Sequence, residues 1–152
     1  MISTKIAING FGRIGRVFLR NAINRPELDI VAINDLADAA TLAHLFKYDS
    51  VHRAFPGTVQ AEGSDLLVNG KRIRVVNSKD PAALPWKEHC IDIVIESTGH
   101  FLDAKSAQSH LNAGAKKVIL SAPAKDDGIK SVVLGVNDAI LDDHDVIVSN
   151  AS

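Results

Sequence analysis

The sequence has little cysteine, few aromatic residues and no excess of charge of either sign. Cys90 is the only cysteine among 152 residues, so neither an internal disulfide nor a cysteine-based metal cluster can form. Lysine and arginine number 17 and aspartate and glutamate 18, a balance that gives no reason to expect nucleic acid or a membrane surface as a partner. No apolar run approaches the roughly 20 residues of a membrane-spanning helix.

The N-terminal residues and the histidines give no sign of targeting or of metal binding. Residues 1–5 lead at once into an apolar strand and resemble neither a signal peptide nor a transit peptide. The six histidines are scattered, and the acidic run 142–145 is interpreted as an exposed turn rather than a metal site. We therefore expect a cytoplasmic protein without a metal site.

Short apolar runs alternate with helical stretches, which favours a parallel α/β sheet. The length suits one domain, and neither a linker nor a second domain is visible. Strands are expected at 5–9, 29–34, 91–97, 117–121, 131–136 and 145–149, and helices at 13–24, 39–46 and 104–112. A hairpin is expected over 65–76, because Asn69-Gly70 suits a type I′ turn, whereas 50–64 is expected to be a loop.

The clearest motif is a glycine-rich turn of the form GxGxxG that directly follows an apolar strand and opens an amphipathic helix. In such a turn Gly10 allows the chain to reverse tightly, Gly12 lets a pyrophosphate approach the backbone, and Gly15 lets the helix lie close to the strand. The first helical N–H groups, near Arg13 and Ile14, would then face an anion. The alternative is a turn that only packs a helix on a sheet.

An acidic residue supports the dinucleotide-binding interpretation. Asp35 ends the second expected strand, 20 residues after Gly15. A carboxylate at this place accepts hydrogen bonds from the adenosine ribose and would repel a 2′-phosphate, which favours NAD over NADP. The alternative role for Asp35 is that of a helix cap or an ordinary loop acid. The two motifs together predict a Rossmann-type, doubly wound, mostly parallel α/β sheet with an inserted hairpin.

Small and hydroxyl residues follow two later strands. Ser97, Thr98 and Gly99 close the strand expected at 91–97, and Ser121 closes the next one. Dinucleotides bind beyond the carboxyl ends of parallel strands, so each hydroxyl is a candidate partner of the cofactor. A plain helix cap is the alternative for each of them.

Several longer stretches carry a family resemblance. They are residues 8–16, 32–36, 45–50, 97–99, 113–118 and 148–152. Through them the chain resembles the phosphorylating, NAD-dependent glyceraldehyde-3-phosphate dehydrogenases over its whole length. In that family the full enzyme oxidises an aldehyde through a cysteine thiohemiacetal, passes hydride to NAD and releases the acyl group to phosphate.

The motifs and the resemblance together assign NAD contacts to ten residues. These are Asn9, Gly10, Gly12, Arg13, Ile14, Asp35, Lys79, Ser97, Gly99 and Ser121. The resemblance places Arg13 and Ile14 at the pyrophosphate, Lys79 near the adenine and Ser121 on the nicotinamide side. It also matches Ser152 to a substrate-contacting serine that immediately precedes the family's catalytic cysteine.

The resemblance implies that residues 1–152 are an NAD-binding domain and that the catalytic domain is absent from this chain. We therefore expect no catalytic residue in it, and a phosphorylated aldehyde as the substrate bound through the missing half. A homotetramer in the cytoplasm is expected by the same resemblance, with no nucleic acid or membrane partner. Two alternatives stay open: an erythrose-4-phosphate dehydrogenase, which shares these motifs, and a stand-alone NAD-binding module without chemistry of its own.

Other residues need a separate interpretation. Arg53 stands where the family usually has glycine, so the loop must differ here if that glycine needs a positive φ. Cys90 lies beside His89, and such a pair could be a nucleophile with its base. Because neighbours in a strand point to opposite faces, we interpret Cys90 as a buried structural residue. Trp86 and Phe101 are expected in the core or in a pocket wall.

Overall fold

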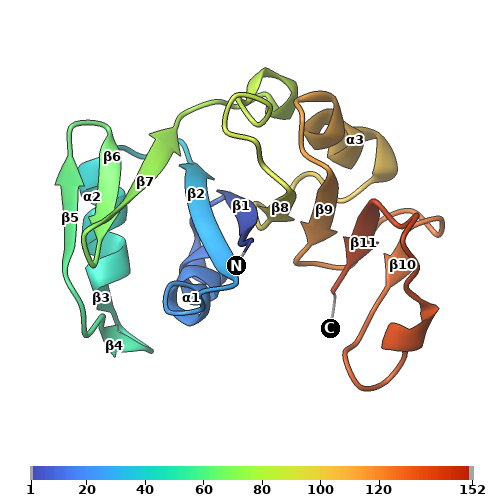
Figure 1. Ribbon diagram of the computed structural model, residues 1–152, viewed down its shortest axis with the longest axis horizontal. Coiled ribbons are helices and arrows are strands. Elements are labelled where there is room, and N and C mark those ends of the chain that lie inside the picture. The colour runs from blue at the N-terminus through green and yellow to red at the C-terminus, as the bar shows by residue number, and fades with distance from the viewer. Residues whose placement is uncertain (1, 151–152) are drawn as a thin grey trace.

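The computed structural model of the protein describes residues 2–150, which form a nine-stranded, mostly parallel sheet with helices on both faces (Figure 1). Its strands are β1 (Thr4–Asn9), β2 (Leu28–Asn34), β5 (Val59–Glu62), β6 (Asp65–Val68), β7 (Lys71–Val76), β8 (Ile93–Glu96), β9 (Lys117–Leu120), β10 (Lys130–Ser131) and β11 (Ile147–Ser149). The other elements are the helices α1 (Arg13–Ala22), α2 (Ala39–Lys47) and α3 (Ala104–Asn112), the 3₁₀ turns η1 (Pro81–Ala83) and η2 (Asp138–Ile140), and the small ladder of β3 (Tyr48–Asp49) with β4 (Arg53–Ala54).

The order of the strands places a switch point at β1. The sheet runs β10-β11-β9-β8-β1-β2-β7-β6-β5, so the chain adds β2 and β7 on one side of β1 and then β8, β9 and β11 on the other. All of these strands run parallel to β1, whereas β6 runs antiparallel to both of its neighbours, β5 and β7. This arrangement confirms the predicted doubly wound α/β fold.

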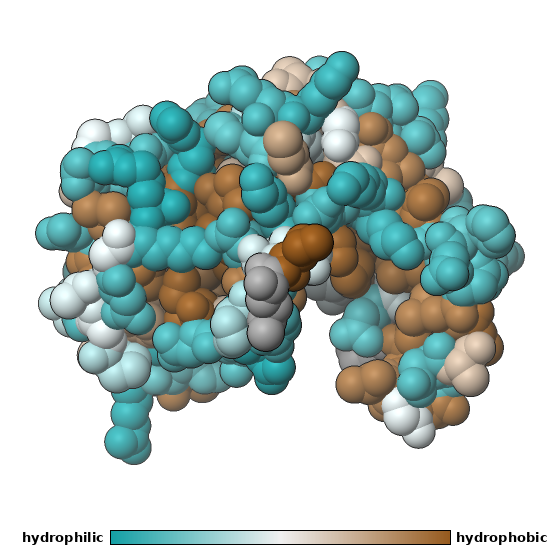
Figure 2. All heavy atoms as spheres, in the orientation of Figure 1, coloured by the Kyte–Doolittle hydropathy of each residue, from teal (hydrophilic) through white to brown (hydrophobic). Residues whose placement is uncertain are grey.

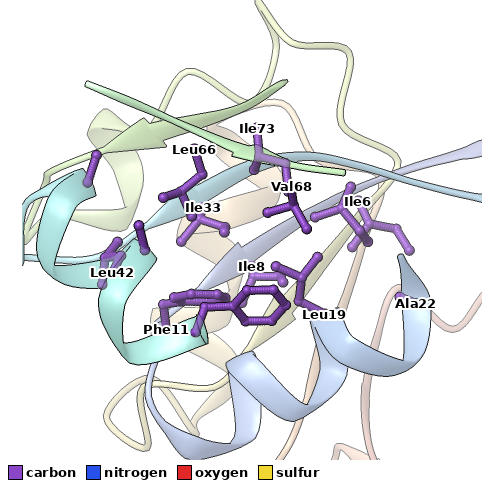
Figure 3. Close-up of a cluster of buried hydrophobic side chains, with 14 of the residues drawn as sticks. Ile6, Ile8, Phe11, Leu19, Ala22, Ile33, Leu42, Leu66, Val68 and Ile73 are labelled. Carbon is purple, nitrogen blue, oxygen red and sulfur yellow. The ribbon is translucent and has the colours of Figure 1, made fainter. Parts of the chain in front are cut away.

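The main core lies between the sheet and the pair of helices α1 and α2 (Figure 3). Phe11, the second residue of the glycine-rich turn, is 1% exposed and points into this core, where its ring centroid lies 5.8 Å from that of Phe46 on α2. Burying a side chain of this size stabilises a fold by roughly 1.5–3 kcal/mol. The buried Phe11 side chain therefore anchors the glycine-rich turn to the core.

The hairpin is confirmed, but it is part of a larger antiparallel meander. Asn69 and Gly70 both have positive φ, at 52° and 78°, as a type I′ turn requires. The prediction of a loop over 50–64 is wrong for β4 and for β5, which pairs with β6. Most residues of β5 are exposed because it is the edge strand, so it lacks the apolar run by which a buried strand is recognised.

Several predicted elements are shorter in the structure, among them the strands predicted at 91–97, 117–121 and 145–149, which are Ile93–Glu96, Lys117–Leu120 and Ile147–Ser149. The helix predicted at 13–24 ends at Ala22, and a turn over residues 23–26 leads into β2. The strand predicted at 131–136 ends at Ser131, because Gly135 has a φ of 78° and Val136 donates a turn hydrogen bond to the carbonyl of Val133. None of the helices within residues 2–150 is both long and apolar enough to cross a membrane.

Arg53 and Cys90, which the sequence analysis considered separately, both have a positive φ. Arg53 has a φ of 64°, so its loop keeps the left-handed conformation that glycine would favour, held by a 3.0 Å hydrogen bond from the Arg20 guanidinium to the Arg53 carbonyl. The prediction that Cys90 is buried is wrong: it is exposed, with a φ of 53°. β8 begins only at Ile93, so Cys90 belongs to the turn before the strand rather than to the core.

Candidate functional site

The carboxyl ends of β1, β2 and β8 surround a cavity of about 450 Å³, which we call the switch-point cavity. It is lined by Asn9, Gly10, Gly12, Asn34, Asp35, Leu36, Ser78, Lys79, Ser97, Thr98, His100 and Phe101. Six of the ten residues predicted to contact NAD are among them: Asn9, Gly10, Gly12, Asp35, Lys79 and Ser97. A ligand in an open α/β sheet binds at this place, beyond the strand ends where the order reverses.

The three glycines of the turn meet different requirements. Gly10 has a φ of 92°, and a Cβ on it would lie 2.8 Å from the Thr98 methyl group. A Cβ on Gly15 would lie 2.3 Å from the Gly10 carbonyl oxygen, so α1 can approach β1 only without a side chain there. A Cβ on Gly12 would meet no atom within 4 Å. The fold therefore requires Gly10 and Gly15, whereas only a molecule in the cavity would require Gly12.

The N-terminus of α1 is free to receive an anion. Asp38 caps α2 and Asp103 caps α3, each carboxylate accepting a hydrogen bond from a backbone N–H group three residues later. The N-cap of α1 is Gly12, and no side chain among residues 2–150 caps this helix. Its first N–H groups, together with the helix dipole, would favour an anion such as a phosphate at the edge of the switch-point cavity.

The Asp35 carboxylate joins β2 to the glycine-rich turn. One oxygen accepts a hydrogen bond from the Phe11 N–H group at 2.8 Å, and the other accepts one from the Ala37 N–H group at 3.0 Å. Each oxygen keeps acceptor capacity toward the cavity. Asp35 is therefore a loop acid that orders its surroundings and also a charge available to ribose hydroxyls.

The predicted serines use their hydroxyl protons within the protein. Ser97 Oγ donates to the Gly10 carbonyl at 2.6 Å, and Ser121 Oγ donates to the Glu96 carbonyl at 3.0 Å. Only their lone pairs remain for a ligand. Sequence reasoning had no means of finding these bonds, since each joins residues of different strands.

Four of the ten residues lie outside the switch-point cavity. Arg13 follows Gly12 and is exposed, and Gly99 follows Thr98 in an exposed turn with a φ of 77°. Ile14 and Ser121 line a second cavity of about 510 Å³, which lies between α1 and the segment after β10 and which we call the apolar cavity. Ser152, the predicted substrate contact, lies outside the described residues.

Figure 2 shows a notch between the larger part of the molecule and the lobe formed after β10, and the apolar cavity is lined by residues of α1 and of the segment after β10. Phe18, Ile95 and Leu134 are among its lining residues. The residues at the N-terminus of α1 thus adjoin both cavities: Gly12 lines the first and Ile14 the second. A ligand made of two halves joined by a pyrophosphate can therefore extend to both sides of this helix end.

Sequence reasoning missed three polar residues of the switch-point cavity. Asn34 and Ser78 line it with Asp35, and His100 lines it with Thr98, which the sequence had already indicated as a candidate hydroxyl partner. One signal was present: Asn9 and Asn34 each follow directly on a run of apolar residues at the end of a strand. Phe101 lines the cavity and Trp86 is buried, which confirms both predictions.

Other candidate sites receive no support. Within residues 2–150, no three His, Cys, Asp or Glu side chains are grouped as a metal would need. The acidic turn at 142–145 is an exposed surface, where Lys130 lies 2.8 Å from Asp145 and 3.1 Å from Asp142 and lowers the pKa of both carboxyls. Cys90 lies before the amino end of β8, whereas the switch-point cavity lies beyond its carboxyl end.

Comparison with known proteins agrees with this geometry. The model of the family "Glyceraldehyde 3-phosphate dehydrogenase, NAD binding domain" matches residues 4–104. The chain is 53% identical over 150 residues to glyceraldehyde-3-phosphate dehydrogenase of Thermotoga maritima, which covers 97% of the chain and 45% of that protein. It is 53% identical over 153 residues to the enzyme of Geobacillus stearothermophilus (99% and 45%) and 52% identical over 148 residues to that of Mycoplasma pneumoniae (97% and 44%).

The chain thus spans less than half the length of these relatives, and the part that it spans contains the glycine-rich turn, Asp35 and the cavity at the switch point. The family model covers the elements from β1 to the start of α3. The chain therefore belongs to the glyceraldehyde-3-phosphate dehydrogenase family, and its residues 4–104 match the NAD-binding domain of that family.

Proposed function

We propose that NAD binds across the N-terminus of α1, with its adenosine half in the switch-point cavity and its nicotinamide half toward the apolar cavity. The observation that carries this proposal is the uncapped helix end at Gly12, which adjoins both cavities. Asp35 then accepts hydrogen bonds from the ribose and Lys79 lies on the adenine side. Ser121 lies on the nicotinamide side, at the wall of the apolar cavity.

The whole protein that contains this domain is proposed to oxidise glyceraldehyde 3-phosphate, with NAD and phosphate, to 1,3-bisphosphoglycerate and NADH. The names of the relatives above support a triose phosphate as the substrate rather than erythrose 4-phosphate. The part played by this domain is to hold the nicotinamide against the reacting carbon. On the same similarity to these relatives we also propose a homotetramer in the cytoplasm. Light scattering on the whole protein tests whether it is a tetramer.

Asp35→Asn tests the placement of the adenosine. The wild-type chain is expected to bind NAD more than about tenfold more tightly than NADP, because the 2′-phosphate would meet the Asp35 carboxylate. Asparagine keeps an oxygen for the Phe11 N–H group but removes the charge, so the preference should fall toward equality. Calorimetric titration of both cofactors measures the two ratios.

Asp38→Asn is the matched control. It removes one charge three residues away, and Asp38 lines no part of the switch-point cavity. The preference for NAD should persist in this variant. Equal affinities for NAD and NADP in the wild-type chain would show that Asp35 does not face the ribose.

A further inference from the structure

A continuous chain of buried and partly buried hydrogen bonds adjoins the switch-point cavity. At its centre is Glu96, whose side chain is 0% exposed. One carboxylate oxygen lies 2.6 Å from Asn9 Nδ2 and 2.6 Å from His110 Nε2. The other lies 3.0 Å from the Thr98 backbone nitrogen and 2.6 Å from Thr98 Oγ1. These bonds join the ends of β1 and β8 to α3.

The groups at the two ends of this hydrogen-bond chain determine which atoms donate along it. The Trp86 indole can only donate, so its 3.0 Å bond to His110 Nδ1 requires a lone pair there and leaves the proton of a neutral ring on Nε2, facing Glu96. At the other end, the backbone N–H group of Ser78 donates to Asn34 Oδ1, so Asn34 Nδ2 donates to Asn9 Oδ1. The Asn9 amide group must then turn its N–H groups toward Glu96.

Glu96 therefore receives a donor at each of its four lone-pair sites, so all acceptor sites of the carboxylate are satisfied within the protein. The Thr98 hydroxyl is fixed as well, because its oxygen also accepts the N–H group of His100 at 3.1 Å. Asn9, Thr98 and His100 all line the cavity. The orientation of each polar group on this part of the wall thus depends on Glu96.

We propose that Glu96 is a positioning residue for the bound dinucleotide, whose carboxylate, oriented from beneath by His110 and Trp86, fixes the Asn9 amide and the Thr98 loop toward NAD. The inference rests on the proposed placement of NAD in the switch-point cavity. A buried carboxylate is costly to desolvate, and an apolar residue at the end of β8 would avoid that cost. The advantage of Glu96 is a wall whose polar groups are already ordered when the ligand arrives.

Glu96→Gln tests this role with a side chain of nearly the same shape. All four groups that contact the Glu96 carboxylate donate hydrogen bonds to it. The amide NH₂ group that replaces one carboxylate oxygen is also a donor, so it cannot accept the two hydrogen bonds that this oxygen received. NAD should bind about tenfold more weakly, the loss expected when a buried hydrogen-bond network is broken. Calorimetry measures the affinity, and circular dichroism verifies the fold. The indole N–H resonance of Trp86, the only tryptophan, should move, because Trp86 donates to His110 and His110 contacts the group that is changed.

Thr98→Val and Thr98→Ser form a second test on a side chain that is only partly buried. Valine removes the hydroxyl that donates to Glu96 and should weaken NAD binding, whereas serine keeps the hydroxyl and should restore most of the affinity. Combining Glu96→Gln with Thr98→Val should weaken binding by less than the sum of the two separate losses, because both changes act on the same hydrogen-bond network.

The inference is wrong if a folded Glu96→Gln variant binds NAD as the wild type does, or if its effect and that of Thr98→Val simply add. Should Glu96→Gln fail to fold, equal affinities of the valine and serine variants would contradict the inference in the same way. The proposed placement of NAD is tested separately, by comparing the NAD and NADP affinities of the wild-type chain with those of the Asp35→Asn variant in the same titration. Loss of the Asp35 effect would contradict that placement, whereas an insensitive Glu96 contradicts only its positioning role.

Discussion

Gly12→Val should abolish measurable NAD binding while the fold stays intact. The φ of Gly12 is −75°, which any residue can adopt, and its Cβ would enter open space. The protein itself therefore has no need of glycine here. A branched side chain would instead occupy the place of the pyrophosphate at the N-terminus of α1, so the affinity should fall by more than about 100-fold. Calorimetric titration and thermal unfolding of the same variant measure both effects.

Gly15→Ala is the matched contrast, because it lies in the same turn and has the opposite expectation. Its Cβ would overlap the Gly10 carbonyl oxygen, so the free energy of unfolding should drop by about 1–3 kcal/mol, the usual cost of overpacking. Wild-type NAD affinity in Gly12→Val would place the pyrophosphate elsewhere. A loss of stability in Gly12→Val as large as that in Gly15→Ala would show that Gly12 too is required by the fold.

The glycine-rich turn could be predicted because its requirements are local. A strand, three glycines and a helix follow each other within residues 4–22, and the spacing itself encodes a close approach of backbone to phosphate. Asp35 was predicted by the same reasoning, as the acid that ends the next strand. Its hydrogen bond to Phe11 was not predicted, since that contact exists only once β1 and β2 are paired.

The polar network under the cavity shows where local reasoning stops. Glu96 and His110 are 14 residues apart and lie on different elements, and the sequence holds no spacing that joins them. In the sequence, His110 is one of six histidines without a regular spacing. Only the packing of α3 on the sheet brings it to Glu96. A weak signal was nevertheless present, because a carboxylate that ends an apolar strand must be hydrogen-bonded if it is buried.

Backbone conformation explains the error at Cys90. Its place before an apolar strand suggested burial by continuity with the strand, but a φ of 53° turns the chain there and exposes the residue. β5 was missed for a related reason: an edge strand needs no apolar face of its own when its partner strand supplies the burial, as β6 does here. The error at Cys90 thus comes from the conformation of the backbone, and the error at β5 comes from its place at the edge of the sheet.

The 152-residue chain should bind NAD and show no oxidation of glyceraldehyde 3-phosphate. The proposed reaction needs a thiolate that adds to the aldehyde carbon, from which hydride then passes to NAD. Cys90 is the only thiol in the sequence, and it lies before the amino end of β8, whereas the proposed NAD site lies beyond the carboxyl end. Absorbance of NADH, with chain, NAD, phosphate and substrate present, should therefore not rise above the blank without protein.

Cys90→Ser separates this expectation from the competing view that Cys90 is the nucleophile and His89 its base. The variant should bind NAD as tightly as the wild type, since Cys90 is exposed and remote from the switch-point cavity. A whole glyceraldehyde-3-phosphate dehydrogenase in the same assay verifies that the reagents support turnover. If the 152-residue chain forms NADH and the Cys90→Ser variant does not, the expectation of an inactive chain is wrong. The reacting thiol would then lie at the opposite edge of the sheet from the glycine-rich turn.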